Sequence, residues 1–279
     1  KAASSPASPR GRDAIQDAMN QHWLRLGAPV LLGVLLLCGC HRSATPAHGL
    51  TIATTTSYLE AAARDLLGDD LNVVRLAEPG TCPGHFDMRP SQVAALRQCR
   101  ALFRFDFQKG LDARLAGSDP HRPRIAPVAL EGGMGRPDSY LLACRQVAEH
   151  LVALGLLSRA EADRRTQAIT DRLNALTHQA TNRVARAGIA GSPVIASSHQ
   201  RDFCEWLGLR VAAAFRAADT ASIGEIERAI DAGTLAGIRL VIANLPEGRR
   251  TADALAERLG AGVVVFENFP ALRQGRVSF

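Results

Sequence analysis

The sequence predicts an α/β protein with two parallel-sheet lobes that are joined by one long rigid helix. Three observations support this prediction: short apolar strands alternate with helices from Leu50 onward, the alternation returns from Val194 onward, and residues 158–187 contain no Gly or Pro. Alternating elements of this length are typical of parallel sheets flanked by helices. The predicted parts are a first lobe at 50–157, a connecting helix at 158–188 and a second lobe at 189–279.

The first lobe opens with an apolar, β-branched strand at Leu50–Thr54, followed by a helix that ends before Gly68. Ser57 with Glu60 three residues later forms a capping box at the start of this helix, and a Gly after the last turn is a common stop signal. This first helix spans 58–67. The other predicted strands of the lobe are 71–76, 101–105 and 125–128. The other predicted helices are one that starts at Ser91, one at 107–115 and one that follows the loop 136–141 and ends at Leu156.

The second lobe repeats this scheme. We expect three of its helices to end at Gly208, Gly233 and Gly260, because glycine commonly follows the last helical turn. The predicted strands are 194–197, 211–214, 240–243 and 263–266, and the predicted helices are 200–207, 223–232 and 252–259.

The connecting helix begins at a second capping box, Ser158 with Glu161, and is expected to end at Gly188. At 1.5 Å per residue, about 29 residues make a helix of roughly 43 Å. A helix of this length is expected to pack along both lobes; the alternative is two helices with a break near Thr177. Its apolar residues recur at spacings of three and four and form one stripe: Ile169, Leu173, Leu176, Ala180, Val184 and Ala187.

The segment Leu35–Cys40 resembles the lipobox of a bacterial lipoprotein signal. Met19 is the natural start, Arg25 the positive flank and Gly39 the small residue before cleavage, so Cys40 becomes the lipidated first residue. The apolar stretch 28–38 has 11 residues, whereas about 20 are needed to span a bilayer. A signal peptide is therefore favoured over a transmembrane helix.

Three segments precede the first lobe. Residues 1–18 are rich in Ser, Pro and Ala and are expected to carry no fold, residues 19–39 form the signal peptide, and residues 40–49 form a short tether. The sequence thus predicts a protein of the periplasm or cell envelope that a lipid anchors to the membrane.

The charge of the chain argues against nucleic-acid binding. Loss of residues 1–39 removes four basic and two acidic side chains, which lowers the net charge from +6 to +4. The remaining chain has no run of Lys and Arg with interleaved aromatic residues, which is a signature of nucleic-acid binding. No nucleic-acid partner is expected.

Four loops at or near predicted strand ends carry side chains that can bind a metal ion. In open α/β sheets ligands bind beyond the carboxyl ends of the strands. Two of the loops, 79–87 and 136–141, lie in the first lobe, and two, 197–200 and 266–268, lie in the second. Their imidazole and carboxylate groups suit zinc or manganese. The sequence therefore predicts a divalent-metal site in a cleft between the lobes.

The chain resembles the zinc-uptake, or cluster A-I, family of ZnuA/TroA-like solute-binding lipoproteins, which supply zinc and manganese to ABC importers. The resemblance covers residues 50–270 and rests on the order and spacing of several segments. These segments are Leu50–Thr56, the Pro-Gly…His85…Pro90-Ser91 loop running into Val93–Leu96, the long central helix, His199 followed by Phe203 and Leu207–Leu209, and Leu259–Val265.

The resemblance implies a ligand set residue by residue. His85 and His199 match two ligating histidines, and Glu267 falls where the family usually has Asp. The family's second histidine, in a Pro-His-x-Trp-Leu pattern, falls on Asp138, which either ligates the metal or caps the following helix. His121 is a rival for this position but lies earlier in the chain, and surface ion pairing is the alternative role for Glu267.

The cysteines of the mature chain leave several roles open. Cys82 lies three residues before His85, and Cys204 lies five residues after His199. Each thiol is a metal ligand, part of a disulfide or a small buried apolar group. The four remaining thiols, Cys82, Cys99, Cys144 and Cys204, allow three pairings in an oxidising compartment.

The resemblance implies a binding protein, not an enzyme. It would act as a monomer that captures Zn²⁺ or Mn²⁺ and delivers the ion to an ABC permease and its ATPase. An alternative is the same two-lobed fold with a metal chelate or another small ligand in the cleft. A metal-dependent hydrolase is the least supported reading, because no Gly-x-Ser-x-Gly, His-Glu-x-x-His or phosphate-binding Gly loop is present.

Overall fold

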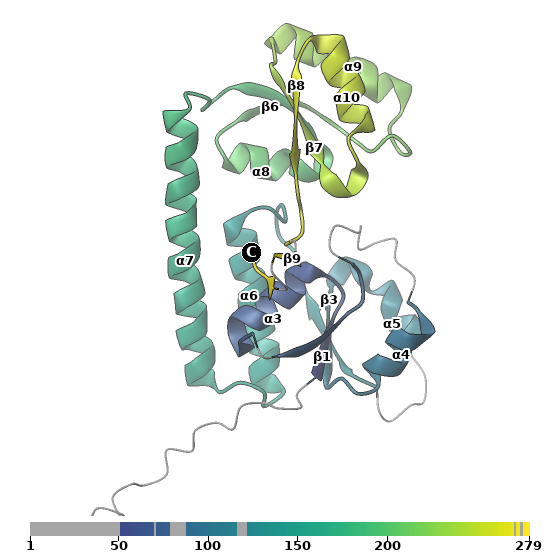
Figure 1. Ribbon diagram of the computed structural model, residues 1–279, viewed down its shortest axis with the longest axis vertical. Coiled ribbons are helices and arrows are strands. Elements are labelled where there is room, and N and C mark those ends of the chain that lie inside the picture. Colours follow the sequence, from purple (N-terminus) through teal and green to yellow (C-terminus); the bar gives the residue numbers. More distant parts are fainter. Residues whose placement is uncertain (1–50, 70, 79–87, 116–121, 271, 274–275) are drawn as a thin grey trace, which may run out of the picture. The chain divides into compact units, whose positions relative to one another are not determined.

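The computed structural model describes residues 51–69, 71–78, 88–115, 122–270, 272–273 and 276–279, all of which belong to one compact unit, Ala47–Phe279. These residues form two four-stranded parallel sheets, which confirms the predicted fold class. Figure 1 shows the helices that flank the sheets. Within the same residues no helix is long and apolar enough to cross a membrane. The predicted signal peptide, Cys40 and the tether lie outside the described residues.

The sheet of the first lobe has the strand order β2-β1-β3-β4. Both of its faces are buried: Ile52 and Phe103 pack in a core cluster with α3 and α6, whereas their neighbours Ala53 and Leu102 pack in a second cluster with Leu96 of α4. The elements of this lobe are β1 (Thr51–Thr54), α3 (Ser57–Leu67), β2 (Asn72–Arg75), α4 (Pro90–Leu96), β3 (Ala101–Phe105), the 3₁₀ turn η1 (Asp106–Gln108), α5 (Gly110–Leu115), β4 (Arg124–Val128) and α6 (Pro137–Ala153).

The sheet of the second lobe repeats this arrangement with the order β6-β5-β7-β8. Ile195 and Val241 pack in a cluster with α9 and α10, and Val194 and Ile242 pack on the other face with Cys204 of α8. The elements are β5 (Pro193–Ser197), η2 (Ser198–Gln200), α8 (Arg201–Trp206), β6 (Arg210–Phe215), α9 (Ile223–Ala236), β7 (Leu240–Asn244), η3 (Leu245–Glu247), α10 (Arg250–Leu259) and β8 (Gly262–Phe266).

The start of α3 differs from the prediction. The N-cap is Thr56, whose side chain accepts a hydrogen bond from the Leu59 amide, and Ser57 is already helical. Glu60 is buried and pairs instead with Arg75 at 2.5 Å and with Arg64 at 2.9 Å. The predicted capping box is wrong because two guanidinium groups are stronger partners for this carboxylate than a backbone amide.

The end of α9 also differs from the prediction. The helix continues through Gly233 to Ala236 and ends at Gly237, which has φ = +61°. Gly233 is buried within the helix, where an added Cβ would lie 2.7 Å from Ile195 Cδ1 and 2.9 Å from Leu259 Cδ1. The absence of a side chain at Gly233 therefore serves close packing against the sheet and α10, not helix termination.

The connecting helix is α7 (Arg159–Arg186), a single unbroken helix of 28 residues with Ser158 as its N-cap. It packs against α6 and α3 of the first lobe. Its buried residues are Ala162, Ile169 and Leu173, whereas Leu176 is 41% exposed. The predicted apolar stripe is thus firmly buried only along the first half of the helix, and its second half is largely solvent-facing.

After β8 the chain returns to the first lobe. Phe269 belongs to the core cluster of that lobe, and the ring of Phe279 stacks on Tyr140 with a centroid separation of 4.1 Å. Between them, β9 (Leu272–Arg273) and β10 (Arg276–Val277) form a short antiparallel pair. The segment after β8, which the sequence assigned to the second lobe, therefore packs on the first.

Candidate metal-binding site

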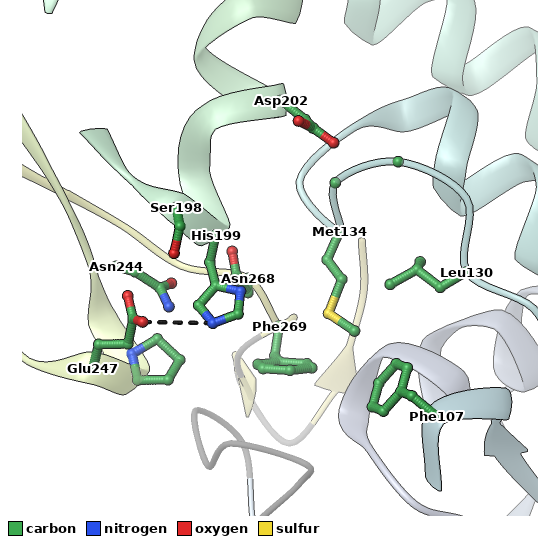
Figure 2. Close-up of a pocket in the computed structure, with 13 residues that line it drawn as sticks. Phe107, Leu130, Met134, Ser198, His199, Asp202, Asn244, Glu247, Asn268 and Phe269 are labelled. Atoms are coloured by element: carbon green, nitrogen blue, oxygen red, sulfur yellow. Dashed lines mark ion pairs between the residues drawn. The ribbon is translucent and has the colours of Figure 1, made fainter. Parts of the chain in front are cut away.

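A cavity of about 430 Å³ lies at the carboxyl ends of the strands. Residues of both lobes line it. The first lobe contributes Phe107, Leu130, Gly132, Gly133 and Met134, and the second contributes Ser198, His199, Asp202, Asn244, Pro246 and Glu247. Asn268 and Phe269, from the segment that follows β8, complete the lining. Figure 2 shows most of the polar groups together on one side of this cavity and three apolar side chains on the other: Ser198, His199, Asn244, Glu247 and Asn268 face Met134, Leu130 and Phe107.

His199 projects into the cavity from η2, the turn that follows β5. The side chain of Ser197, at the end of the strand, accepts a hydrogen bond from the His199 amide at 3.3 Å. The next residue, Gln200, is fully buried and fixes the other end of the turn. Between these two buried anchors the imidazole stays 59% exposed, so it is available to a ligand.

Gln200 joins three strand ends of the second lobe. Its amide nitrogen donates to Asn244 Oδ1 at 3.0 Å and to Asn268 Oδ1 at 2.6 Å. Asn244 is the last residue of β7, and Asn268 follows β8. All three amide side chains are buried. This network holds the floor of the cavity rigid beneath His199.

Glu247, in the η3 turn after β7, faces His199. Its Oε1 lies 3.5 Å from His199 Nε2, and the Ser197 hydroxyl donates to its Oε2 at 2.5 Å. The Glu247 side chain is 17% exposed, and Figure 2 shows the carboxylate directed at the imidazole. The sequence reasoning missed Glu247, although its position in the short loop that follows the predicted strand 240–243 was a usable signal.

A glycine-rich loop brings the first lobe to this site. A Cβ on Gly133 would lie 2.9 Å from Asp202 Cβ, and one on Gly135 would lie 3.0 Å from the Phe203 ring, both in α8 of the second lobe. The two glycines therefore permit a backbone approach that other residues would obstruct. Met134 between them lines the cavity. The sequence reasoning did not anticipate this contact.

Of the two metal ligands predicted in the first lobe, His85 and Asp138, only Asp138 is among the described residues. His85 lies outside the described residues, as do Cys82 and the rival His121. Asp138 is described: it is 59% exposed, forms an ion pair with Arg136 and does not line the cavity. The hydrogen bond from Arg136 lowers the pKa of the Asp138 carboxyl below its ordinary value. Asp138 also accepts a hydrogen bond from the Ser139 amide in the first turn of α6.

Glu267 follows β8 and is exposed. It lines a neighbouring cavity of about 440 Å³ together with Phe203 and Phe269. Asn268 and Phe269 line both cavities, so Glu267 lies one residue away from the site that contains His199.

The described cysteines are buried free thiols. Cys204 packs in the apolar cluster beneath the β5–β7 face of the second lobe, and burial raises its pKa to about 12. Burial raises the pKa of Cys99 to about 11 and also raises that of Cys144. Thiols of this kind stay protonated at neutral pH, whereas a metal binds the thiolate. Their location is that of small apolar core residues.

Within the described residues no three His, Cys, Asp or Glu side chains gather closely enough to hold a metal ion. The described chain thus supplies a pair, His199 and Glu247, at the edge of a cavity that both lobes line. An imidazole and a carboxylate form part of a ligand set for zinc or manganese.

A comparison with protein-family models identifies the family of this chain. Residues 52–277 match the family model described as zinc-uptake complex component A, periplasmic. The chain belongs to this family. No curated protein matches the sequence.

Solved structures share the fold of this zinc-uptake family member at low sequence identity. A crystal structure of ZnuA has a TM-score of 0.67 and 15% identity, covering 80% of this chain and 93% of that one. The laminin-binding protein Lmb of Streptococcus agalactiae, described as an adhesin with metal-transporting activity, has a TM-score of 0.67 and 14% identity, covering 82% and 93%. The Mn-bound periplasmic metal-binding protein of Candidatus Liberibacter asiaticus has a TM-score of 0.67 and 10% identity, covering 82% and 92%.

Proposed function

We propose that this protein is an extracytoplasmic substrate-binding protein that captures a divalent transition metal, zinc or manganese, and delivers it to an ABC importer. The observation that carries the proposal is the match of residues 52–277 to the zinc-uptake family. The exposed His199 imidazole in a cavity lined by both lobes supports it. The partners of such a protein are the importer's permease and its ATPase.

The proposed ligands combine the family resemblance with the geometry. His199 lies in the cavity. By the family's pattern, His85 would supply a second histidine ligand. Asp138 and Glu267 remain proposed ligands by position. For Asp138 to bind the metal it must leave Arg136, which costs the energy of that ion pair.

The proposed location is the periplasm or cell envelope. The Leu35–Cys40 segment supports cleavage before Cys40 and lipid attachment to it. A lipid anchor would keep a monomeric binding protein close to its permease. The family's role is uptake of a metal, a binding function, and we propose no catalytic residue.

Metal binding would act by bridging the lobes. An ion held by ligands from both sides of the cavity favours the arrangement in which those ligands meet, and the unbroken α7 limits how far the lobes can separate. Ligand imidazoles must be neutral and ligand carboxylates ionised, so acidification should release the metal.

Elemental mass spectrometry of the purified full chain tests the proposal. We expect about one equivalent of a single metal per chain after competition among zinc, manganese, iron and copper. A His85→Ala/His199→Ala variant should lose this metal. Absence of bound metal in the unsubstituted chain under every loading condition would rule out the proposed function.

A second candidate is capture of a metal chelate. The specific observation in its favour is the apolar part of the cavity wall, formed by Phe107, Met134 and Phe269, within a volume of about 430 Å³ that exceeds the needs of a bare ion. Native mass spectrometry distinguishes the candidates, because a chelate adds the mass of its organic part to that of the ion.

A further inference from the structure

We infer that Glu247 is a metal ligand and that it forms a binding pair with His199 on the second lobe. This inference rests on the proposed function and assigns a ligand that neither the sequence pattern nor the family resemblance supplied. The pair consists of His199 Nε2 and Glu247 Oε1, which are 3.5 Å apart.

The separation of the two atoms suits joint coordination. A good N–H···O hydrogen bond spans about 2.7–3.2 Å, so at 3.5 Å the pair is too far apart for a strong direct bond. Two ligand atoms each about 2.1 Å from one zinc ion, at the tetrahedral angle, lie roughly 3.4 Å apart. The observed spacing therefore matches two ligands of one ion.

The surroundings of Glu247 leave one oxygen free for the metal. The Ser197 hydroxyl holds Oε2 at 2.5 Å, which orients Oε1 toward the imidazole. In the described part of the chain Glu247 has no Arg or Lys ion pair, whereas Asp138 is neutralised by Arg136. A carboxylate that is 17% exposed and lacks a cationic partner gains most from a divalent cation.

The scaffold behind the pair is rigid. His199 and Glu247 lie in the turns after β5 and β7, which are adjacent parallel strands. Gln200 links the end of β7 to the residues after β8 through two buried hydrogen bonds. The two ligand atoms are thus positioned before any metal arrives, which lowers the ordering cost of binding.

This arrangement assigns the first capture step to the second lobe. One imidazole and one carboxylate hold the ion there and cancel one of its two positive charges, while the remaining positions stay open for first-lobe ligands or water. A mixed N/O pair accepts both zinc and manganese, so it does not by itself select between them.

The test compares Glu247→Gln with Glu257→Gln, an exposed carboxylate on α10 outside the cavity. Zinc and manganese affinities of the full chain are measured by competition with a chromophoric chelator. We expect Glu247→Gln to weaken zinc binding by about 100-fold or more, since loss of even an outer partner of a metal ligand costs about 10–100-fold. Glu257→Gln should bind as the unsubstituted chain does.

A ligand exchange separates coordination from a positioning role. Glu247→His should keep zinc within about tenfold and lose manganese, because imidazole suits zinc and carboxylate suits manganese. If Glu247 only orients His199, both substitutions weaken the two metals in parallel, and the inference is wrong. Thermal melting of the metal-free variants checks that each one is folded.

The outcomes also separate this inference from the proposed function. If the unsubstituted chain binds zinc and His199→Ala loses it while Glu247→Gln does not, the function stands and the role of Glu247 is refuted. If the unsubstituted chain binds neither zinc nor manganese, both the function and the pair are refuted. Loss of binding in both variants, with the metal exchange described above, supports the pair.

Discussion

A methyl group added at Gly233 should destabilise the protein, although alanine is normally the better helix residue. The new Cβ would lie 2.7 Å from Ile195 Cδ1 and 2.9 Å from Leu259 Cδ1, both closer than any relaxed carbon contact. Overpacking of a core lowers the free energy of unfolding by about 1–3 kcal/mol. Replacing Gly by Ala within a helix raises the free energy of unfolding by about 0.5–1 kcal/mol. The two terms leave a net loss of roughly 1 kcal/mol, and at most about 2.5 kcal/mol.

Gly224→Ala in the same helix is the matched control. Its Cβ would meet only Arg228 Nη1, at 3.5 Å, so the substitution should stabilise the protein by about 0.4–1 kcal/mol. In a domain of this size each kcal/mol shifts the melting temperature by about 2–4 °C. Calorimetry should therefore show Gly233→Ala melting lower, and Gly224→Ala slightly higher, than the unsubstituted protein. Equal stabilisation by both substitutions would refute the packing described around Gly233.

Three further predictions follow from buried polar groups. Glu60→Gln removes the carboxylate that Arg64 and Arg75 share and should lower the free energy of unfolding by about 3 kcal/mol in urea titrations. Ser197→Ala releases Glu247 and should weaken zinc binding by about tenfold in chelator competition, with little change for a variant outside the site. Burial raises the pKa of the Cys204 thiol from 9.0 to about 12, so between these pH values unfolding releases the thiol proton. The free energy of unfolding therefore falls as pH rises above 9, by at most about 1.4 kcal/mol per pH unit. Cys204→Ala should reduce the corresponding fall in melting temperature between about pH 8 and 10.5.

Each of these predictions has an opposing result. Unchanged unfolding of Glu60→Gln would mean that its two arginines are satisfied by water. Unchanged zinc affinity of Ser197→Ala would mean that Glu247 needs no support from β5. An identical alkaline decline in Cys204→Ala would assign that decline to other groups.

The architecture was predictable because its signals are local. Strands buried on both faces, such as Ala101–Phe105, appear in the sequence as short apolar runs, and Gly188 and Gly260 follow helices as stop signals. Gly233 gives the same local signal, but it lies inside α9, where its missing side chain permits close packing against Ile195 and Leu259. A sequence pattern cannot distinguish a glycine that ends a helix from one that admits a neighbouring side chain.

The site was predictable in part. His199 was identified from its place directly after a strand, and it lies in the cavity. Glu247, in the η3 turn that follows β7, gives a similar local signal, but the family pattern drew attention to Glu267 after the next strand. Gly133 and Gly135 approach α8, which lies about 70 residues later in the chain. The local periodicity of a sequence cannot predict a contact between segments so far apart.

Isothermal titration of the metal-free full chain with zinc and with manganese tests metal capture most directly. The account predicts saturation at about one equivalent of at least one of these ions, and loss of that binding in the His85→Ala/His199→Ala variant. No heat of binding for either ion, or saturation that the double variant retains unchanged, would contradict it.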